Sequence, residues 1–152
     1  MSAETRLVEM GITLPKRMAP AGSYVPAVQT GNLLFLSGAG PIDADGKPVQ
    51  GKLGKDMDVA QGQAAARLVA LQLLATIREH CGSLDRVKRI VKVLCMVNCT
   101  PEFGESPAVA NGASDLFVEL FGEAGRHARS AVGMNALPIG IAVEIEMIVE
   151  IE

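Results

Sequence analysis

The stretch IAVEIEMIVEIE, residues 141–152, places apolar side chains at every odd-numbered position and glutamates at four of the even-numbered ones. Successive side chains of a β-strand point to opposite faces. The pattern therefore predicts a strand with one buried face and one acidic, solvent-facing face. Alternation of this kind is typical of an antiparallel sheet that packs against helices on one side only.

The residues before this strand predict four more strands and two helices. A β-branched run at Ile90–Val97 and a turn-bounded apolar run at Leu33–Ser37 are typical of buried strands. Asp58 is a suitable N-cap for an alanine-rich helix, and Pro107 suits the first turn of a second helix. The expected strands before residue 141 are Tyr24–Gln29, Leu33–Ser37, Ile90–Val97 and Ala128–Leu137, and the expected helices are 58–80 and 107–121.

The order strand, strand, helix, strand, helix, strand, strand predicts an α+β fold, with two helices packed on one face of a mixed sheet. Residues 1–152 are expected to form one domain, in which residues 1–20 are a lead-in segment. Two helices cannot cover both faces of such a sheet. The other face is therefore exposed or meets another subunit, and we expect a homo-oligomer.

Pro138 and Gly140 indicate a turn between the last two strands. In a simple hairpin around that turn, Arg129 would pair with a residue near Ile148. Glu144 would then lie roughly 13 Å away at the usual rise of a strand, so direct contact within one subunit is not expected. A ligand and a water molecule could span part of this gap, or the two residues could come from adjacent subunits.

Composition argues against nucleic acid and membranes as partners. The formal net charge is -3 and aromatic residues make up only 3% of the chain, whereas nucleic-acid binding uses basic surfaces and stacked rings. No apolar run approaches the ~20 residues that span a bilayer. The three cysteines are an odd number without a visible secretion signal, which indicates reduced thiols and a cytoplasmic location.

Sequence motifs for metal, phosphate or nucleophile chemistry are missing, and no metal or cofactor is expected. Neither His80 nor His127 has a partner at metal-ligand spacing. Gly38 and Gly40 follow a strand, but no Gly-rich phosphate loop is completed there. No serine lies in a G-x-S-x-G context, so the sequence does not indicate a serine hydrolase.

Two charged residues stand out in the last two strands. Arg129 lies among small apolar residues, where its planar guanidinium could bind a carboxylate by two hydrogen bonds. The alternative is a strand-end arginine in a surface salt bridge. Glu144 begins the acidic face of the last strand and is the second candidate. The alternative interpretation is that Glu144 is one of four equivalent solvent-facing glutamates.

The neighbourhood of these two residues resembles a known family. Three segments carry the resemblance, namely Ala128-Arg129-Ser130-x-Val132, Leu137-Pro138 and Val143-Glu144-Ile145-Glu146. Together they resemble the C-terminal signature of the YjgF/RidA family. Members of that family have been labelled endoribonuclease L-PSP and enamine/imine deaminase. Shorter matches extend the resemblance to about residues 20–152, and they lie at Tyr24-Val25, Gly31-Asn32, Ser37-Gly38, Asn111 and Leu116-Phe117.

The resemblance implies a chorismate-mutase-like fold, a homotrimer and ligand sites in the clefts between subunits. In the deaminase branch, the arginine matching Arg129 binds the substrate carboxylate and the glutamate matching Glu144 positions the attacking water. Small reactive 2-imino or 2-enamino acids become 2-oxo acids and ammonia there, without a cofactor. The substrate-binding positions implied here are Tyr24, Ser37, Gly38, Asn111 and Ala131.

The chain also departs from the compact deaminases. Ala131 and Ala39 stand where a cysteine and a glutamine are common, and the lead-in and the loop at residues 98–106 make the chain longer. It looks closer to a longer subgroup. Imine or enamine hydrolysis is the first hypothesis. A trimeric protein that binds a small carboxylate metabolite without turnover is the second, and an endoribonuclease is the third.

Overall fold

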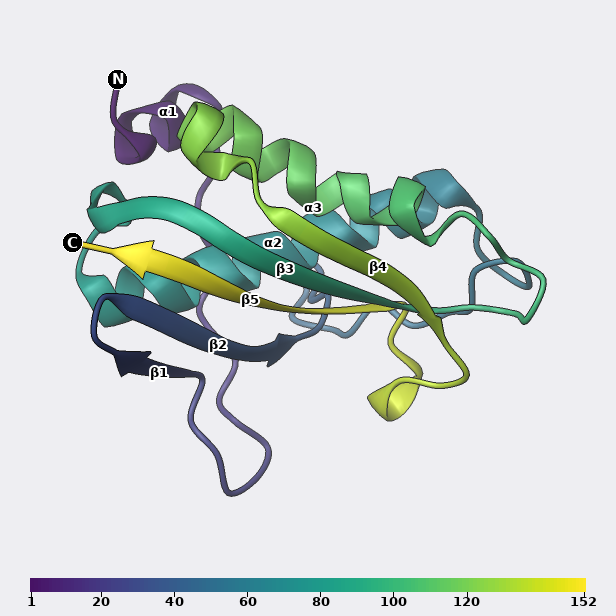
Figure 1. Cartoon of the computed structure of the whole chain (residues 1–152). Helices are drawn as coiled ribbons and strands as arrows, with labels where there is room; N and C mark the ends of the chain where they lie inside the picture. Colours follow the sequence, from purple (N-terminus) through teal and green to yellow (C-terminus); the bar gives the residue numbers. More distant parts are fainter.

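All 152 residues are described by the structure, a computed structural model, and a five-stranded sheet forms its centre (Figure 1). The strands are β1 (Ala27–Thr30), β2 (Leu33–Ala39), β3 (Val87–Asn98), β4 (Ala128–Met134) and β5 (Val143–Ile151). The helices are α1 (Ala3–Glu9), α2 (Val59–Cys81) and α3 (Ser106–Phe121), and short 3-10 turns lie at Leu84–Arg86, Gly122–Gly125 and Pro138–Gly140. The predicted α+β class and the order of the predicted elements are confirmed.

The sheet has the strand order β1-β2-β5-β3-β4, so the last strand of the chain lies in the middle (Figure 1). β3 and β4 are parallel, and the other neighbouring pairs are antiparallel. Parallel strands need a crossover connection, which α3 supplies between β3 and β4. The expected hairpin between the last two strands is therefore wrong, because β3 separates β4 from β5.

This topology changes the neighbours of Arg129. It pairs with Val93 of β3, whereas Ile148 pairs with Lys92 of β3 and Phe35 of β2. β4 is an edge strand, so Arg129 has a neighbouring strand on one side only. Its side chain points to the same face as the buried Val93, the face that the helices cover, and it reaches α3 there.

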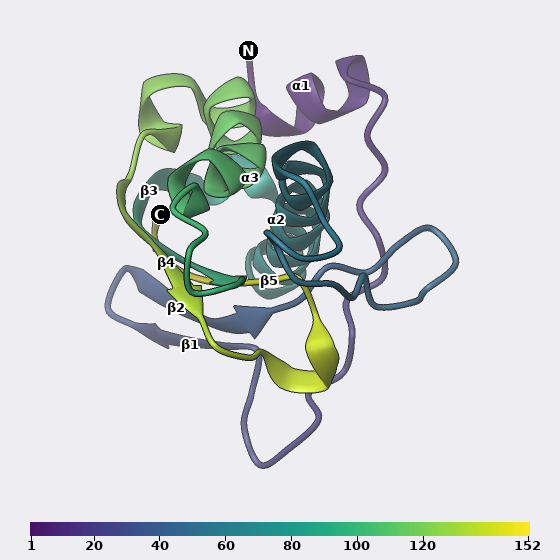
Figure 2. The same cartoon turned by 90° about the vertical axis from the view of Figure 1, so that its right-hand side faces the viewer.

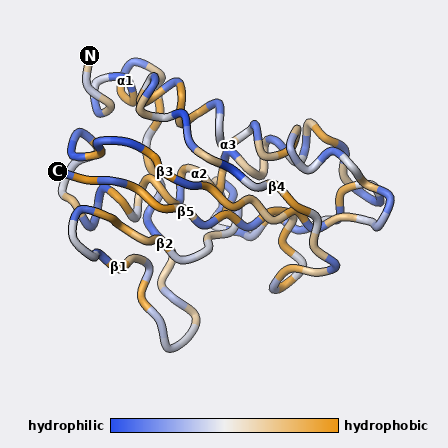
Figure 3. Tube along the Cα trace, viewed as in Figure 1, coloured by the Kyte–Doolittle hydropathy of each residue, from blue (hydrophilic) through white to orange (hydrophobic).

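α2 and α3 pack on the same face of the sheet, and the edge-on view shows no α-helix on the other face (Figure 2). The core between the two layers includes Leu34, Val93 and Ile145 from the strands and Leu73 and Phe117 from the helices, each at most 1% exposed. Hydrophobic residues concentrate along the central strands (Figure 3). The arrangement expected for the helices is confirmed.

The helix limits agree with the local sequence signals. Asp58 caps α2, since its Oδ1 accepts a hydrogen bond from the Gln61 N–H at 2.8 Å and the Gln61 Oε1 accepts one from the Asp58 N–H at 2.9 Å. Gly82 ends α2 with a φ of 85°, a left-handed conformation that favours glycine. None of the three α-helices combines the length and apolar character that a bilayer span requires.

The lead-in contains a helix that the sequence interpretation did not assign. Ser2 caps α1 by accepting a hydrogen bond from the Thr5 N–H at 3.1 Å, and Leu7 of α1 is 2% exposed. Glu4 forms an ion pair with Arg78 of α2 and accepts a hydrogen bond from the Leu84 N–H at 2.8 Å. These contacts attach the lead-in to the end of the helical layer.

The face of the sheet without helices carries both apolar and charged side chains. Phe35 is 41% exposed and pairs across the sheet with Val28 on one side and Ile148 on the other. Lys92 and Glu146 lie beside them, and the group lines a shallow depression. We call this surface the open face of the sheet.

Candidate active site

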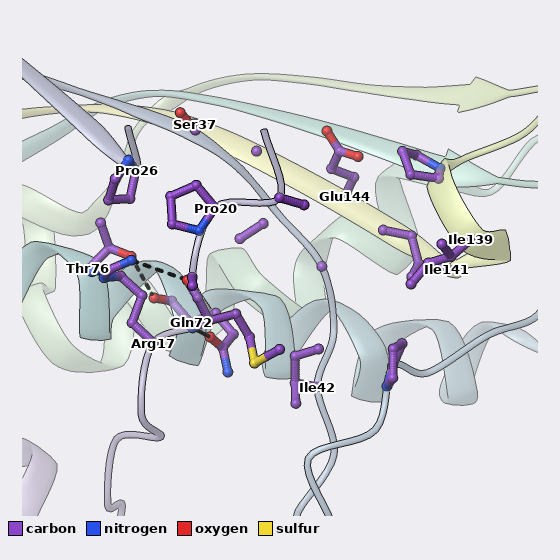
Figure 4. A pocket seen from close by; sticks show the side chains of 18 of the residues that line it. Arg17, Pro20, Pro26, Ser37, Ile42, Gln72, Thr76, Ile139, Ile141 and Glu144 are labelled. Carbon is purple, nitrogen blue, oxygen red and sulfur yellow. Dashed lines mark hydrogen bonds between the residues drawn. The ribbon is translucent and has the colours of Figure 1, made fainter. Parts of the chain in front are cut away.

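A cavity of about 550 Å³ lies at the edge of β2, beyond the end of the shorter strand β1 (Figure 4). Figure 4 shows Ser37 and Glu144 on the side of the sheet, and Gln72 and Thr76 on the side of α2. The segment between α1 and β1 borders the space between them through Pro20. Four of the expected site residues line this cavity, namely Tyr24, Ser37, Gly38 and Glu144.

Gly38 lies directly against the carboxyl group of Glu144. The pairing of β2 with β5 shifts register between Leu36 and Ala39, and this irregularity contains Gly38. A Cβ atom at position 38 would overlap the Oε2 atom of Glu144. The bare backbone of glycine leaves the space that the carboxylate occupies, and a larger residue here would displace the flexible end of Glu144.

The carboxyl group of Glu144 is half-buried and has no basic partner. Burial raises its pKa, and the nearby charge of Glu146 raises the pKa further. Glu144 takes part in none of the ion pairs of the chain. A carboxylate with a raised pKa at the wall of a cavity is a stronger base than an exposed carboxylate, so it accepts a proton from water more readily.

The turn beside this cavity adopts an unusual backbone conformation. Ile139 has a φ of 51°, and it is the single non-glycine residue with positive φ. A β-branched side chain is disfavoured in this left-handed region. The Gln50 Nε2–H donates a hydrogen bond to the Ile139 carbonyl oxygen at 2.5 Å, which helps to hold the turn at the cavity wall.

Arg129 lies outside this cavity, at the contact between β4 and α3. Its Nη1 donates hydrogen bonds to the Asn111 Oδ1 at 2.8 Å and to the Ser114 Oγ at 3.1 Å. No carboxylate of the chain forms an ion pair with Arg129. The alternative interpretation of Arg129, a strand-end arginine in a surface salt bridge, is therefore wrong. A guanidinium without an ionic partner can bind an external carboxylate.

Ser114 also contacts His127, which directly precedes β4. The Ser114 Oγ lies 2.9 Å from the His127 Nε2, and the His127 Nδ1 lies 2.7 Å from the Gly125 carbonyl oxygen. Burial lowers the pKa of His127. The hydrogen bond to Gly125 opposes this change and the charge of Arg129 adds to it. The ring is therefore neutral at neutral pH.

The sequence-predicted residues thus fall into two separate groups. Tyr24, Ser37 and Gly38 share the cavity with Glu144, whereas Asn111 contacts Arg129 at the edge of the sheet. Ala131 lies on β4 beside Cys95 and packs against the core, on the same side as Arg129. Arg129 faces α3 and Glu144 belongs to the open face, so one chain does not bring them together.

Sequence reasoning missed Ser114, His127, Gln72 and Thr76. Ser114 follows Asn111 by three residues, a spacing that places both side chains on one face of a helix. His127 precedes Arg129 by two residues, the period of a strand. These spacings could have pointed to Ser114 and His127, but nothing local predicts that the two cavity residues of α2 lie near Glu144.

Thiol chemistry is not favoured at this site. Cys95 is fully buried in β3, and burial raises its pKa to about 12 although the charge of Arg129 lowers it. A thiol with such a pKa is not a thiolate at neutral pH. No three His, Cys, Asp or Glu side chains lie close enough together to hold a metal ion.

Residues 4–151 match a family model described as YjgF/chorismate mutase-like, and that description also carries an endoribonuclease label. The match covers nearly the whole chain. The chain belongs to the YjgF/RidA family. In this family, the protein TCP17 of Trypanosoma cruzi is 49% identical over 146 residues, which cover 95% of this chain and 91% of the relative.

The family also includes proteins named for an activity. A 2-iminobutanoate/2-iminopropanoate deaminase of Dermatophagoides farinae is 33% identical over 141 residues, covering 93% of this chain and 95% of the relative. A crystal structure of a candidate endoribonuclease from Shewanella oneidensis superposes with a TM-score of 0.95 at 37% identity, covering 99% of this chain and 100% of the other. This coverage means that the lead-in with α1 is part of a fold shared within the YjgF/RidA family.

Proposed function

We propose that this protein hydrolyses small reactive 2-imino or 2-enamino acids to 2-oxo acids and ammonia. The observation that carries the proposal is the partnerless carboxylate of Glu144 at the wall of a cavity, with Gly38 packed against it. The deaminase name of a relative that aligns over 93% of this chain supports the same reaction class.

In this proposal, Arg129 binds the carboxylate of the substrate. Its Nη1 is hydrogen-bonded to Asn111 and Ser114, while its Nε and Nη2 have no partner within the chain. These two nitrogens lie along one edge of the guanidinium, which matches the geometry of a bidentate contact with a carboxylate. Asn111 keeps the role of a substrate-site residue by holding the opposite side of the same group.

Glu144 positions the attacking water. The water oxygen adds to C2 of the protonated imine, one water proton passes to the Glu144 carboxylate, and a tetrahedral amino alcohol forms. The proton then moves from Glu144 to the amino group. The C–N bond breaks with its electron pair on nitrogen, ammonia leaves, and loss of the hydroxyl proton gives the 2-oxo acid. A protonated imine is already electrophilic, so a positioned water and a carboxylate anchor suffice.

We further propose that the working site lies between subunits of a homotrimer, because Arg129 and Glu144 of one chain belong to different faces of the sheet. The open face supports association, since Val28, Phe35 and Val132 are each at least 40% exposed there. In such an assembly, one subunit provides the arginine and another provides the cavity with Glu144. We place this reaction in the cytoplasm, where the three free cysteines would stay reduced.

The test is the formation of ammonia and 2-oxo acid from freshly generated 2-iminopropanoate and 2-iminobutanoate. Turnover above the spontaneous rate that disappears in Arg129→Ala is the expected result. An assembled wild-type protein that leaves both imines at the buffer rate would contradict the proposal. In that case, binding of 2-oxobutanoate without turnover would favour the second candidate, a sensor of a small carboxylate metabolite.

A further inference from the structure

The contacts of Arg129 extend beyond the residues that the proposed reaction needs. Ser114 links the guanidinium to the ring of His127, and His127 in turn reaches the backbone of Gly125. Neither Ser114 nor His127 lines the cavity with Glu144. Any role of these two residues in the proposed reaction is therefore exerted through Arg129 and not by contact with the substrate in that cavity.

The donors and acceptors available fix the direction of each hydrogen bond between Arg129 and Gly125. A carbonyl oxygen can only accept, so the hydrogen of the His127 ring is on Nδ1 and points to the Gly125 oxygen. In the neutral ring Nε2 is then a bare acceptor, and the Ser114 hydroxyl donates to it. The lone pairs of the Ser114 Oγ are left to face the guanidinium, which can only donate.

The guanidinium is oriented by the acceptors on one of its sides. Nη1 carries two hydrogens, and Asn111 and Ser114 accept both. The free hydrogens are those of Nε and Nη2, which form the edge suited to a carboxylate. If the Ser114 hydroxyl pointed its hydrogen at Arg129 instead, donor would face donor and this orientation would be lost.

His127 and Gly125, at the other end of this series of hydrogen bonds, are held by close packing. The Phe117 ring meets the His127 ring in an edge-to-face contact with centroids 5.9 Å apart, and Phe117 is fully buried. Gly125 lies so close to α3 that a Cβ atom there would overlap the Phe117 carbonyl oxygen. The acceptor of the His127 hydrogen is therefore fixed relative to α3, which also carries Asn111 and Ser114.

We infer that Ser114 and His127 are positioning residues for Arg129, which hold one side of its guanidinium so that the Nε–Nη2 edge faces a bound carboxylate. This inference rests on the proposed function in one respect, since it takes Arg129 as the carboxylate anchor. Holding a long side chain in its binding conformation reduces the entropy lost on binding, an effect of about 2- to 10-fold in affinity.

The test compares Ser114→Ala with Ser114→Thr, which keeps the hydroxyl. Ser114→Ala is expected to raise KM for the imine and Kd for 2-oxobutanoate by about 2- to 10-fold, with kcat changed less, while Ser114→Thr restores both constants. Ser83→Ala is the matched control, because Ser83 caps the turn at Leu84–Arg86 and has no contact with Arg129. His127→Gln should resemble Ser114→Ala, and His80→Gln should resemble wild type.

Two results would overturn the inference. One is a Ser114→Ala protein whose KM and Kd equal those of Ser83→Ala. The other is a Ser114→Thr protein as impaired as Ser114→Ala, because packing rather than the hydroxyl would then be responsible. The Kd arm separates this inference from the proposed reaction. If wild type binds 2-oxobutanoate without turning over the imines, the proposed hydrolysis is contradicted, but the Kd values of the variants still test the role of Ser114. If wild type neither binds nor turns over, both proposals are contradicted.

Discussion

Arg129 and Glu144 extend from opposite faces of the sheet, and β3 lies between the strands that carry them. Arg129 turns toward α3, where Asn111 and Ser114 accept its hydrogen bonds. Glu144 belongs to the open face and packs against Gly38. A substrate that touches both residues must therefore lie between two copies of the chain, which makes assembly and chemistry inseparable in the proposed reaction.

Arg129→Ala should lower kcat/KM for 2-iminobutanoate by at least about 30-fold, because a substrate carboxylate would lose its charged hydrogen-bond partner. Arg129→Lys should recover only part of the loss, since an ammonium group cannot form the bidentate contact. Arg126→Ala is the matched control. Arg126 is exposed and pairs with Glu123, so equal losses in the two alanine variants would contradict the anchor role.

Glu144→Gln should lower kcat by about 100-fold while KM changes little, because the amide cannot accept a proton from the attacking water. The variant should unfold no more easily than wild type. The raised pKa of Glu144 means that folding favours its protonated form, so ionisation of this group at neutral pH opposes folding. Initial rates and thermal unfolding check both statements. A fully active Glu144→Gln protein would remove the water-positioning role.

Gly38→Ala should lower kcat although it adds a single methyl group. The new Cβ would overlap Oε2 of Glu144, so the carboxylate must move away from its place at the cavity wall. Gly104→Ala is the control, because a Cβ at position 104 meets no atom within 4 Å. Kinetics of both variants, with assembly checked by sedimentation, test this relationship, and similar rates for the two would show that the contact is unimportant.

The activity should fall on the acid side as pH passes down through the raised pKa of Glu144, since only its carboxylate form can accept a proton. Burial and the charge of Glu146 both raise this pKa above the ordinary value of 4.5. Glu146→Gln should therefore shift the acid limb of kcat to lower pH. Glu119→Gln, on the exposed side of α3, should leave it in place. An unchanged profile in Glu146→Gln would contradict the assignment of the limb to Glu144.

Phe35→Glu should dissociate the proposed homotrimer and abolish turnover together. Phe35 lies on the open face between Val28 and Ile148, where a buried charge would oppose association. Val8→Glu is the control, because Val8 is an exposed apolar residue of α1 on the helical side. Sedimentation velocity with parallel rate measurements gives the answer. A wild-type protein that sediments as a stable monomer would rule out a site between subunits.

Local patterns predicted most of the elements because each depends on neighbours a few residues apart. The alternation in residues 141–152 appears as the buried odd-numbered residues of β5, and the Asp58 cap appears at the start of α2. Helix α1 was missed, since its seven residues are too few for a clear period and its contacts are with distant segments, namely α3, the turn at Leu84–Arg86 and Arg78 of α2. The resemblance, rather than any period, pointed to Tyr24, Ser37, Gly38 and Asn111.

The sequence by itself determined the α+β class, the order of the main elements and the side of the last strand that is buried. These properties follow from periods of 2 and 3.6 residues, which are local in the chain. Only the tertiary structure decided that β5 lies between β2 and β3, that Gly38 meets Glu144, and that His127 and Ser114 stand behind Arg129. Strand order depends on which surfaces bury one another after the α3 crossover, a property of the whole chain and of no single segment.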